Sequence, residues 1–160
     1  MMFTERDHFW MQHAIQLAKT AAQNNEVPVG AVLISEDKII GEGWNRPILH
    51  SDPTAHAEVI ALRDAAKNIN NYRLIDSTLY ITLEPCIMCV GAMVHARVKR
   101  VVFGAIDPKT GAVQSMFQLG ETDKFNHQIN YAGGLLAEQC SELLKDFFQK
   151  RRAEKNAQKA

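Results

Sequence analysis

The chain opens with the pattern of an amphipathic helix. Apolar residues recur at three- and four-residue spacing, which places on one face Trp10, Ala14, Leu17, Ala18 and Ala21. Thr4 followed by Asp7 can form a capping box at the start of this segment. The pattern stops at Asn24-Asn25, so we predict a helix between these two signals.

Two extended apolar runs follow this helix. Residues 29–34 form the first run and residues 38–44 the second, and the turn-forming pair Glu36-Asp37 separates them. This arrangement predicts a β-hairpin. The glycines at 41 and 43 have the spacing of a phosphate-binding loop, but no helix follows them, so we interpret them as a β-bulge.

Beyond the hairpin, helical and extended patterns alternate. The predicted elements are helices at about 55–69 and 86–95 and strands at 78–82 and 100–104. Residues 107–127 are polar and show no clear period. A hairpin followed by alternating helices and strands indicates a three-layer α/β fold, in a single domain spanning 1–160.

The C-terminal segment has the pattern of a long amphipathic helix. Its apolar face carries Leu136, Cys140, Leu143, Leu144, Phe147 and Phe148. From about 145 to 160 the segment is a basic helix or tail, with Lys145, Lys150, Arg151, Arg152, Lys155 and Lys159. We interpret Cys140 as a small buried hydrophobe because it lies at a regular position of the apolar face. Only the last ten residues look dispensable to a core.

Composition and charge narrow the class of protein. The 160 residues are 46% hydrophobic and 22% charged, which is typical of one soluble globular domain. Eighteen basic residues balance eighteen acidic ones, so a polyanionic partner would have to bind a local basic patch. The N-terminus lacks the order of a signal peptide, and no apolar run could span a bilayer. We therefore expect no membrane association and a cytoplasmic location.

Two short motifs carry the candidate chemistry, His-Ala-Glu at 56–58 and Pro-Cys-Ile-Met-Cys at 85–89. Each lies at the start of a predicted helix. Residues two apart do not share a helix face, so His56 and Glu58 can serve one site only if it lies off the helix end. The two cysteines are three apart and project together, and the helix dipole favours their thiolate forms. The two helix starts could thus converge on one metal ion.

A metal site of this composition would be catalytic. His56, Cys86 and Cys89 supply three ligands and leave a fourth tetrahedral position for water. The charges of Zn²⁺, two thiolates and a neutral imidazole sum to zero, and the metal can still acidify its water. A nearby carboxylate must then take the proton and return it, a role that we assign to Glu58.

The combined pattern H-x-E…P-C-x-x-C is the signature of the zinc nucleobase deaminases. Over nearly its whole length the chain resembles one family within the zinc cytidine/deoxycytidylate deaminase superfamily, the bacterial tRNA-specific adenosine deaminases. The segments that carry this resemblance are EVPVGAV at 26–32, GWNRP at 43–47, DPTAHAE at 52–58, NYRL at 71–74, LEPCIMC at 83–89, VVFGA at 101–105 and DFF…RR at 146–152.

The resemblance implies hydrolytic deamination of adenosine to inosine at the wobble position of a tRNA anticodon, classically that of an arginine tRNA. It also implies a homodimer of α/β/α cytidine-deaminase-like subunits, each with a five-stranded mixed sheet in the order 2-1-3-4-5 and one Zn²⁺. By position in the motifs, the metal ligands are His56, Cys86 and Cys89, and the proton shuttle is Glu58.

Substrate contacts are carried over in the same way. Asn45 is similar to the family residue that hydrogen-bonds the purine, and the backbone around Ala57 and the segment Val27-Pro28 should wall the base pocket. The candidate RNA contacts on the terminal helix are Phe147, Phe148, Arg151 and Arg152. In the alternative interpretation these phenylalanines belong to the core and the charges form a solvated face. Residues 115–124 are the least similar to the family, so no RNA contact is assigned there.

Three other functions fit parts of the pattern. A deaminase of a free base or nucleoside, such as guanine or cytosine, would have the same metal motif, although Asn45 and the basic tail favour RNA. A non-catalytic, zinc-stabilised RNA-binding module would have no need for the carboxylate of Glu58. A Cys-x-x-Cys redox pair would leave both His56 and Glu58 without a role.

Overall fold

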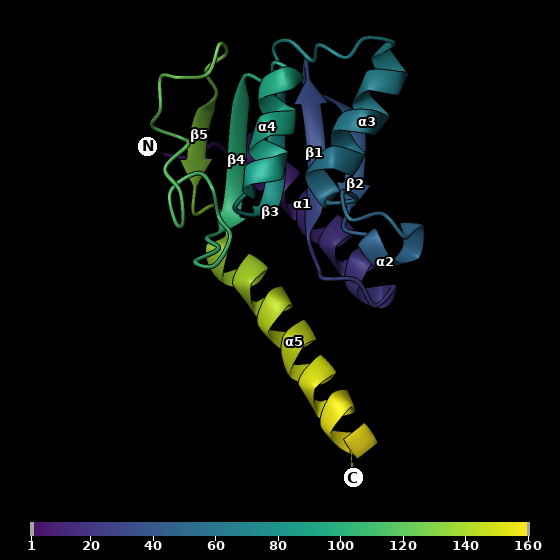
Figure 1. Cartoon of the computed structure of the whole chain (residues 1–160). Coiled ribbons are helices and arrows are strands. Elements are labelled where there is room, and N and C mark those ends of the chain that lie inside the picture. The colour runs from purple at the N-terminus through teal and green to yellow at the C-terminus, as the bar shows by residue number, and fades with distance from the viewer. Residues whose placement is uncertain (1, 160) are drawn as a thin grey trace.

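The chain folds into three layers, with a central sheet between two pairs of helices (Figure 1). This computed structural model describes residues 2–159, so Met1 and Ala160, the ends of the predicted domain, lie outside the described residues. The elements are α1 (Glu5–Gln23), β1 (Gly30–Ser35), β2 (Lys38–Trp44), α2 (Pro47–His50), α3 (Ala57–Ile69), β3 (Thr78–Leu83), α4 (Ile87–His95), β4 (Arg100–Ala105), β5 (Asn130–Gly133) and α5 (Ala137–Lys159).

The sheet has the order β2-β1-β3-β4-β5. Strand β1 runs antiparallel to both β2 and β3, while β3, β4 and β5 run parallel to one another. The five-stranded mixed sheet in the order 2-1-3-4-5 is therefore confirmed. Because β1 is antiparallel to both neighbours, β2 and β3 run in the same direction and end at the same edge of the sheet, and the two motifs follow these two strands in the chain.

Each face of the sheet has its own apolar core, because successive side chains of a strand point to opposite faces. Alternate strand residues pack with α3 and α4 on one face, among them Leu33, Leu79, Ile81, Val101 and Phe103. The residues between them pack with α1 and the start of α5 on the other face, among them Val32, Ile34, Tyr80 and Val102. Both faces of the central strands are thus covered, which agrees with the near-continuous apolar runs of the sequence.

The first helix begins as predicted. The Thr4 hydroxyl accepts a hydrogen bond from the Asp7 backbone N–H, and the Asp7 carboxylate accepts one from the Thr4 backbone N–H. This reciprocal pair is a capping box. The helix ends at Gln23, with Asn24 as its C-terminal cap.

The β-bulge predicted at the two glycines of β2 agrees with a register shift beside Gly41, and the glycines also make room for α3. The pairing of β1 with β2 shifts register between Leu33 and Ile34. A side chain at Gly41 or Gly43 would collide with the backbone of α3, since an added Cβ would lie only 2.4 and 2.3 Å from its carbonyl oxygens. The glycines allow α3 to pack directly on the strand, and the start of α3 carries half of the candidate site.

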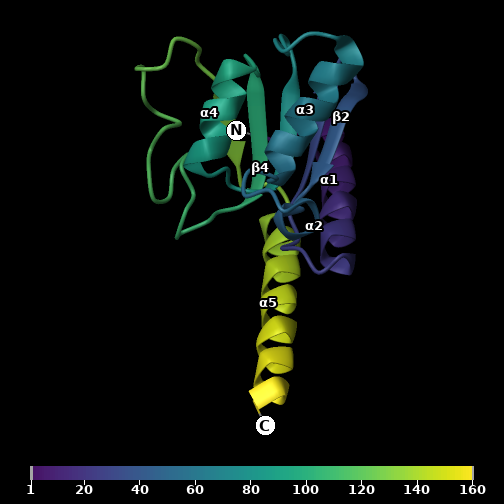
Figure 2. The same cartoon turned by 45° about the vertical axis from the view of Figure 1, so that its right-hand side comes forward.

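The last helix, α5, extends well beyond the sheet (Figures 1 and 2). Cys140 at its start is buried as predicted, and it is the only fully buried residue of the described helix. Phe147 is half-buried and Phe148 is 41% exposed. All described residues after Phe148 are exposed, so the predicted apolar face serves the core only over the first turns. No helix within residues 2–159 combines the length and apolar character that a membrane span requires.

Candidate metal centre and active site

The predicted ligands occupy the caps of two helices. His56 is the N-terminal cap of α3 and Cys86 that of α4, and each has an extended backbone conformation. The side chain of such a cap commonly accepts a hydrogen bond from its own helix. Neither side chain does so here, so both remain available to a ligand beyond the helix end. The helices begin at Ala57 and Ile87, slightly later than the sequence predicted.

The three donor atoms converge. The Nδ1 atom of His56 lies 3.5 Å from the Sγ atoms of both Cys86 and Cys89. A tetrahedral zinc ion with bonds of about 2.3 Å to sulfur and about 2.0 Å to nitrogen would hold these atoms about 3.6 Å apart. The donor set therefore fits zinc in both chemistry and spacing. Within residues 2–159, no other group of three His, Cys, Asp or Glu side chains is close enough to hold a metal.

The charges at the site also suit a cation. A hydrogen bond from Cys89 lowers the pKa of the Cys86 thiol to about 4, against the opposing effect of burial. The same hydrogen bond and burial raise the pKa of Cys89, because its proton is shared with the Cys86 sulfur. The hydrogen bond with Cys86 raises the pKa of His56. Binding of a metal would displace the protons that these donors carry, because the ligands must be deprotonated.

Glu58 lies beside this centre, in the first turn of α3, and is 4% exposed. Burial raises the pKa of its carboxyl to about 7. A group with this pKa can accept and return a proton near neutral pH. Because it is not part of the converging donor set, Glu58 is free to act as an acid and base.

A cavity of about 190 Å³ opens onto the metal centre. It is lined by Val27, Val29, Asn45, His56, Glu58, Leu83, Glu84, Cys86, Asp107 and Thr110. Of the predicted pocket residues, Val27 and Asn45 line it, whereas Pro28 and Ala57 are buried and are not part of its lining. Cys89 is also buried. The structure thus brings most of the predicted site together.

A second cavity, of about 550 Å³, continues from this pocket toward α5. The two cavities share Val27, Leu83, Asp107 and Thr110, and the second adds Ile106, Pro108, Lys109, Leu144, Lys145 and Phe148. Phe148 therefore faces a groove that leads to the site. Phe147 and Arg151 line a separate hollow, whose other residues are Ala22, Asn25, Lys150 and Glu154, and Arg152 lines none of these cavities.

Sequence reasoning missed several residues of the pocket. Glu84, Asp107 and Thr110 all line it but were not among the predicted site residues. Glu84 directly precedes the Pro-Cys motif, which was a signal that could have pointed to it. The other two lie at the start of 107–127, where the sequence has no period that would place them.

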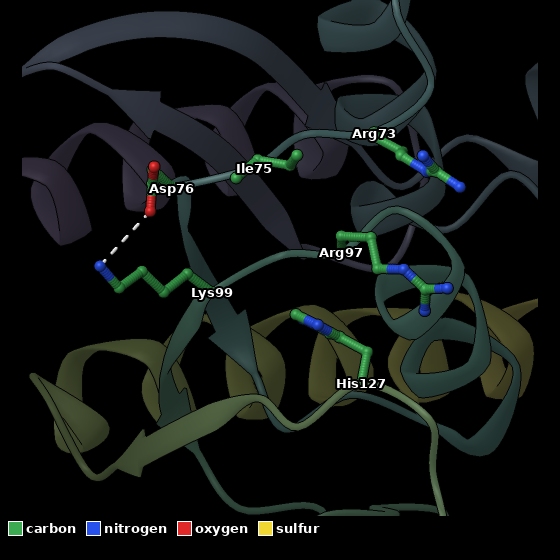
Figure 3. Close-up of a pocket in the computed structure, with 6 residues that line it drawn as sticks. All are labelled: Arg73, Ile75, Asp76, Arg97, Lys99 and His127. Atoms are coloured by element: carbon green, nitrogen blue, oxygen red, sulfur yellow. Dashed lines mark hydrogen bonds and ion pairs between the residues drawn. The ribbon is translucent and has the colours of Figure 1, made fainter.

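A third cavity, of about 440 Å³, lies at the opposite edge of the sheet, where β3, β4 and β5 begin (Figure 3). Its lining is mainly basic, and the Lys99 ammonium pairs with the Asp76 carboxylate at 3.4 Å. A six-residue strand spans about 20 Å, so the length of β3 or β4 separates this cavity from the metal centre. It contributes nothing to the site described above.

Comparisons with known proteins agree with this geometry. The family model for the zinc-binding region of cytidine and deoxycytidylate deaminases matches residues 4–105. A tRNA-specific adenosine deaminase of Haemophilus influenzae is 57% identical, over 98% of this chain and 91% of that protein. One of Bacillus subtilis is 42% identical, over 95% and 94%. A solved tRNA:A34 deaminase, from work on A-to-I editing at the wobble position, superposes with a TM-score of 0.82 at 38% identity, over 85% of this chain and 99% of that one. The chain therefore belongs to the cytidine and deoxycytidylate deaminase family and, within it, to the tRNA-specific adenosine deaminases.

Proposed function

We propose that this protein hydrolyses adenosine to inosine at the wobble position of a tRNA anticodon, with release of ammonia. The observation that carries the proposal is the convergence of three metal donors from two helix starts beside a buried carboxylate. A structural zinc site would use four protein ligands, and a redox pair of cysteines would need neither His56 nor Glu58. The names of the relatives support tRNA adenosine as the substrate.

His56, Cys86 and Cys89 would hold the zinc ion. When bound, zinc supplies a water molecule whose pKa is low enough to make it a nucleophile at neutral pH. The cap positions leave the side chains of two of these ligands free of capping hydrogen bonds and thus available to the metal. His56 and Cys86 line the same pocket as Glu58, so a water bound by the metal would be within reach of this carboxylate.

Glu58 would carry the protons of the reaction. Its carboxylate accepts a proton from the attacking water, which adds at C6 of the purine. The resulting carboxylic acid then protonates the ring nitrogen. The carboxylate accepts a second proton, from the new hydroxyl group at C6, and passes it to the amino group as the C6–N bond breaks and the carbonyl of inosine forms. One water is consumed and one ammonia is released, so Glu58 ends in the state in which it began.

The neighbouring side chains would orient the base. Asn45 lies in the lining of the pocket, with its backbone N–H held by the Val29 carbonyl at 3.0 Å. Its side chain is therefore well placed to hydrogen-bond the purine, while Val27 offers an apolar wall. A flipped base from an anticodon loop can enter such a pocket because unstacking a loop nucleotide costs only a few kcal/mol.

The groove toward α5 would hold the flanking RNA. Its lining combines an exposed aromatic ring with the ammonium groups of Lys109 and Lys145. Aromatic rings can stack on unpaired bases, and lysines bind phosphates without sequence preference. Arg151, Arg152 and their basic neighbours lie further along the same helix and would extend this contact to the stem.

The resemblance of the sequence supports an arginine tRNA as substrate and a cytoplasmic homodimer as the active form. A dimer would have twice the 18.0 kDa mass of the chain, which sedimentation of the zinc-loaded protein measures. A monomeric mass for fully active protein would contradict this assembly.

One comparison of substrates tests the function itself. The purified protein is incubated with the anticodon stem-loop of an arginine tRNA and, separately, with free guanine, cytosine and adenosine. We expect inosine at the wobble position alone and no ammonia from the free compounds. Deamination of a free base with an unchanged stem-loop would instead favour the free-base alternative, and zinc-dependent RNA binding without any deamination would favour a non-catalytic module.

A further inference from the structure

Glu84 is a buried carboxylate at the end of β3 that the proposed chemistry does not use. It is 2% exposed and follows the last residue of the strand. One oxygen, Oε2, accepts hydrogen bonds from the backbone N–H groups of Val113, Gln114 and Ser115, at 3.1, 2.9 and 3.0 Å. The other, Oε1, accepts one from the Asp107 N–H at 3.1 Å and one from the Ser115 hydroxyl.

All these donors belong to one segment, residues 107–115, which has no helix or strand of its own. A buried carboxylate is costly unless its lone pairs are satisfied. Here the backbone of a loop satisfies them, so the loop conformation and the charge depend on each other. The loop also passes close to the carboxylate at Gly111. A side chain at this position would collide with Glu84, since an added Cβ would lie 2.4 Å from the Glu84 Cδ atom.

The held segment forms a shared wall of the site. Asp107 and Thr110 line both the pocket at the metal centre and the groove toward α5. Their side chains are joined to each other, since the Thr110 hydroxyl donates to the Asp107 carboxylate at 2.7 Å. Two anchors therefore fix this wall, the internal turn at Asp107 and the external bonds to Glu84.

We propose that Glu84 is a positioning residue, which holds residues 107–115 as the wall between the base pocket and the RNA groove. Its kinetic consequence rests on the proposed function, because only a nucleotide with its flanking RNA would use both sides of this wall. Glu84 also lines the pocket, but both of its carboxylate oxygens are engaged by the hydrogen bonds to this segment. Displacing a positioned wall by about 1 Å can cost as much as 100-fold in rate.

The test is Glu84→Gln, which keeps the size of the side chain but replaces one acceptor oxygen by a donor. Backbone donors of the loop then face an N–H group. We expect faster hydrogen exchange at residues 107–115, unchanged zinc content, and a kcat/KM for the wobble adenosine of a stem-loop that falls by about 10- to 100-fold. A rise in KM should account for part of this fall, since the wall contacts the substrate.

The matched control is Asp7→Asn, a carboxylate-to-amide change at a residue that is 3% exposed on the other face of the sheet. It should lower stability while leaving kcat/KM within about two-fold at a temperature where both proteins are folded, since Asp7 has no contact with the wall. Equal effects of the two variants on kcat/KM would overturn the proposal, because general destabilisation would then explain both.

Two further variants keep the test decisive if Glu84→Gln does not fold. Ser115→Ala removes one of the five hydrogen bonds, and should change loop exchange and KM in the same direction but to a smaller extent. Gly111→Ala pushes the loop from the carboxylate and should reproduce the large effect. The exchange measurement needs no substrate, so unchanged protection of 107–115 would refute the anchoring even if the proposed function were wrong.

Discussion

At the scale of single residues, the site depends on side chains that leave their usual local partners. His56 and Cys86 are helix caps that make no capping hydrogen bond. Glu58 is buried without joining the donor set. Each of these positions costs local stability, and the cost is offset by the metal that the three donors can share.

Asp7 shows the opposite case, a buried carboxylate with a purely structural role. It accepts hydrogen bonds from the Tyr80 hydroxyl at 2.7 Å and from both Arg100 Nη atoms, at 2.8 and 3.1 Å. Burial opposes ionisation, but the bonds from Arg100, Thr4 and Tyr80 together hold the pKa of Asp7 far below its usual range. The ionised Asp7 carboxylate therefore links α1 to β3 through Tyr80 and to β4 through Arg100.

The lowered pKa determines how the contribution of Asp7 to the free energy of unfolding changes with pH. The folded pKa of Asp7 is below the unfolded value of about 3.9, so its contribution is complete above that value and is lost as the pH falls toward the folded pKa. Asp7→Asn should reduce the free energy of unfolding by roughly 2–4 kcal/mol at pH 7. Between pH 7 and pH 3 the wild type should lose about 1 kcal/mol more than the variant.

Urea unfolding of both proteins at the two pH values measures this difference. If the two proteins lost the same free energy between pH 7 and pH 3, Asp7 would not be ionised in the folded state as described. The pH 7 comparison alone would not reveal this, because lost packing could also destabilise the variant.

At the scale of elements, local patterns predicted the hairpin, α1, α3, β3, α4 and β4, because each has its own hydrophobic period. They missed β5 and α2, which have none. Strand β5 is four residues long and depends on pairing with β4. Helix α2 begins where the buried Glu26 carboxylate accepts the N–H groups of Ile48 and Leu49, at 3.3 and 2.7 Å, a contact that spans more than twenty residues of sequence.

Some residues of the site could likewise be predicted from local spacing and others could not. Spacing alone predicted that the two motifs could meet off their helix ends, and the strands β2 and β3, which run in the same direction, bring these helix starts to one edge of the sheet. The adjacent motif could have pointed to Glu84 as a pocket residue, but its role could not be foreseen because its hydrogen-bond partners lie 23 to 31 residues away, in a segment without a period. Long-range hydrogen bonds to the backbone of a loop do not affect the spacing of hydrophobic residues along the sequence.

The packing of α3 on β2 should control the metal site. Gly43→Ala would place a Cβ 2.3 Å from the Ala57 carbonyl oxygen, at the turn of α3 that carries His56 and Glu58. The helix start must move, so we expect stability to fall by about 1–3 kcal/mol and zinc affinity to fall at least several-fold. Thermal unfolding and a competitive zinc titration measure the two effects.

Gly91→Ala is the matched control in α4, since a Cβ there meets nothing within 4 Å. In a helix interior alanine is favoured over glycine by about 1 kcal/mol, so this variant should be more stable with unchanged zinc affinity. Equal zinc affinity in the Gly43 and Gly91 variants would show that the direct helix–strand contact does not position the ligands.

At the scale of the whole molecule, a neutral chain must bind a polyanion through local charge. The pocket, the groove and the exposed length of α5 lie at one edge of the sheet. The basic cavity of Figure 3 lies at the opposite edge, where β3, β4 and β5 begin. We therefore expect RNA to contact the lysines of the groove and the basic residues of α5, and not the basic residues of the cavity in Figure 3. Net charge alone could not have made this distinction.

Salt dependence tests that assignment. Arg151→Ala should weaken binding to the stem-loop and reduce the slope of log affinity against log salt by about one unit, because one phosphate contact is lost. Lys99→Ala removes the same charge at the opposite edge and should leave the slope unchanged. A flatter slope for Lys99→Ala, with no change for Arg151→Ala, would contradict this assignment, because it would show that the RNA binds at the opposite edge of the sheet.

The most direct test of the central claim is a single-turnover assay of inosine formation at the wobble adenosine, with wild type and Glu58→Gln compared at equal zinc content. We expect both proteins to hold one zinc ion per chain, and the variant to be slower by at least about 100-fold because its amide cannot carry the protons. A zinc-loaded Glu58→Gln protein that forms inosine at a near-normal rate would contradict the central claim.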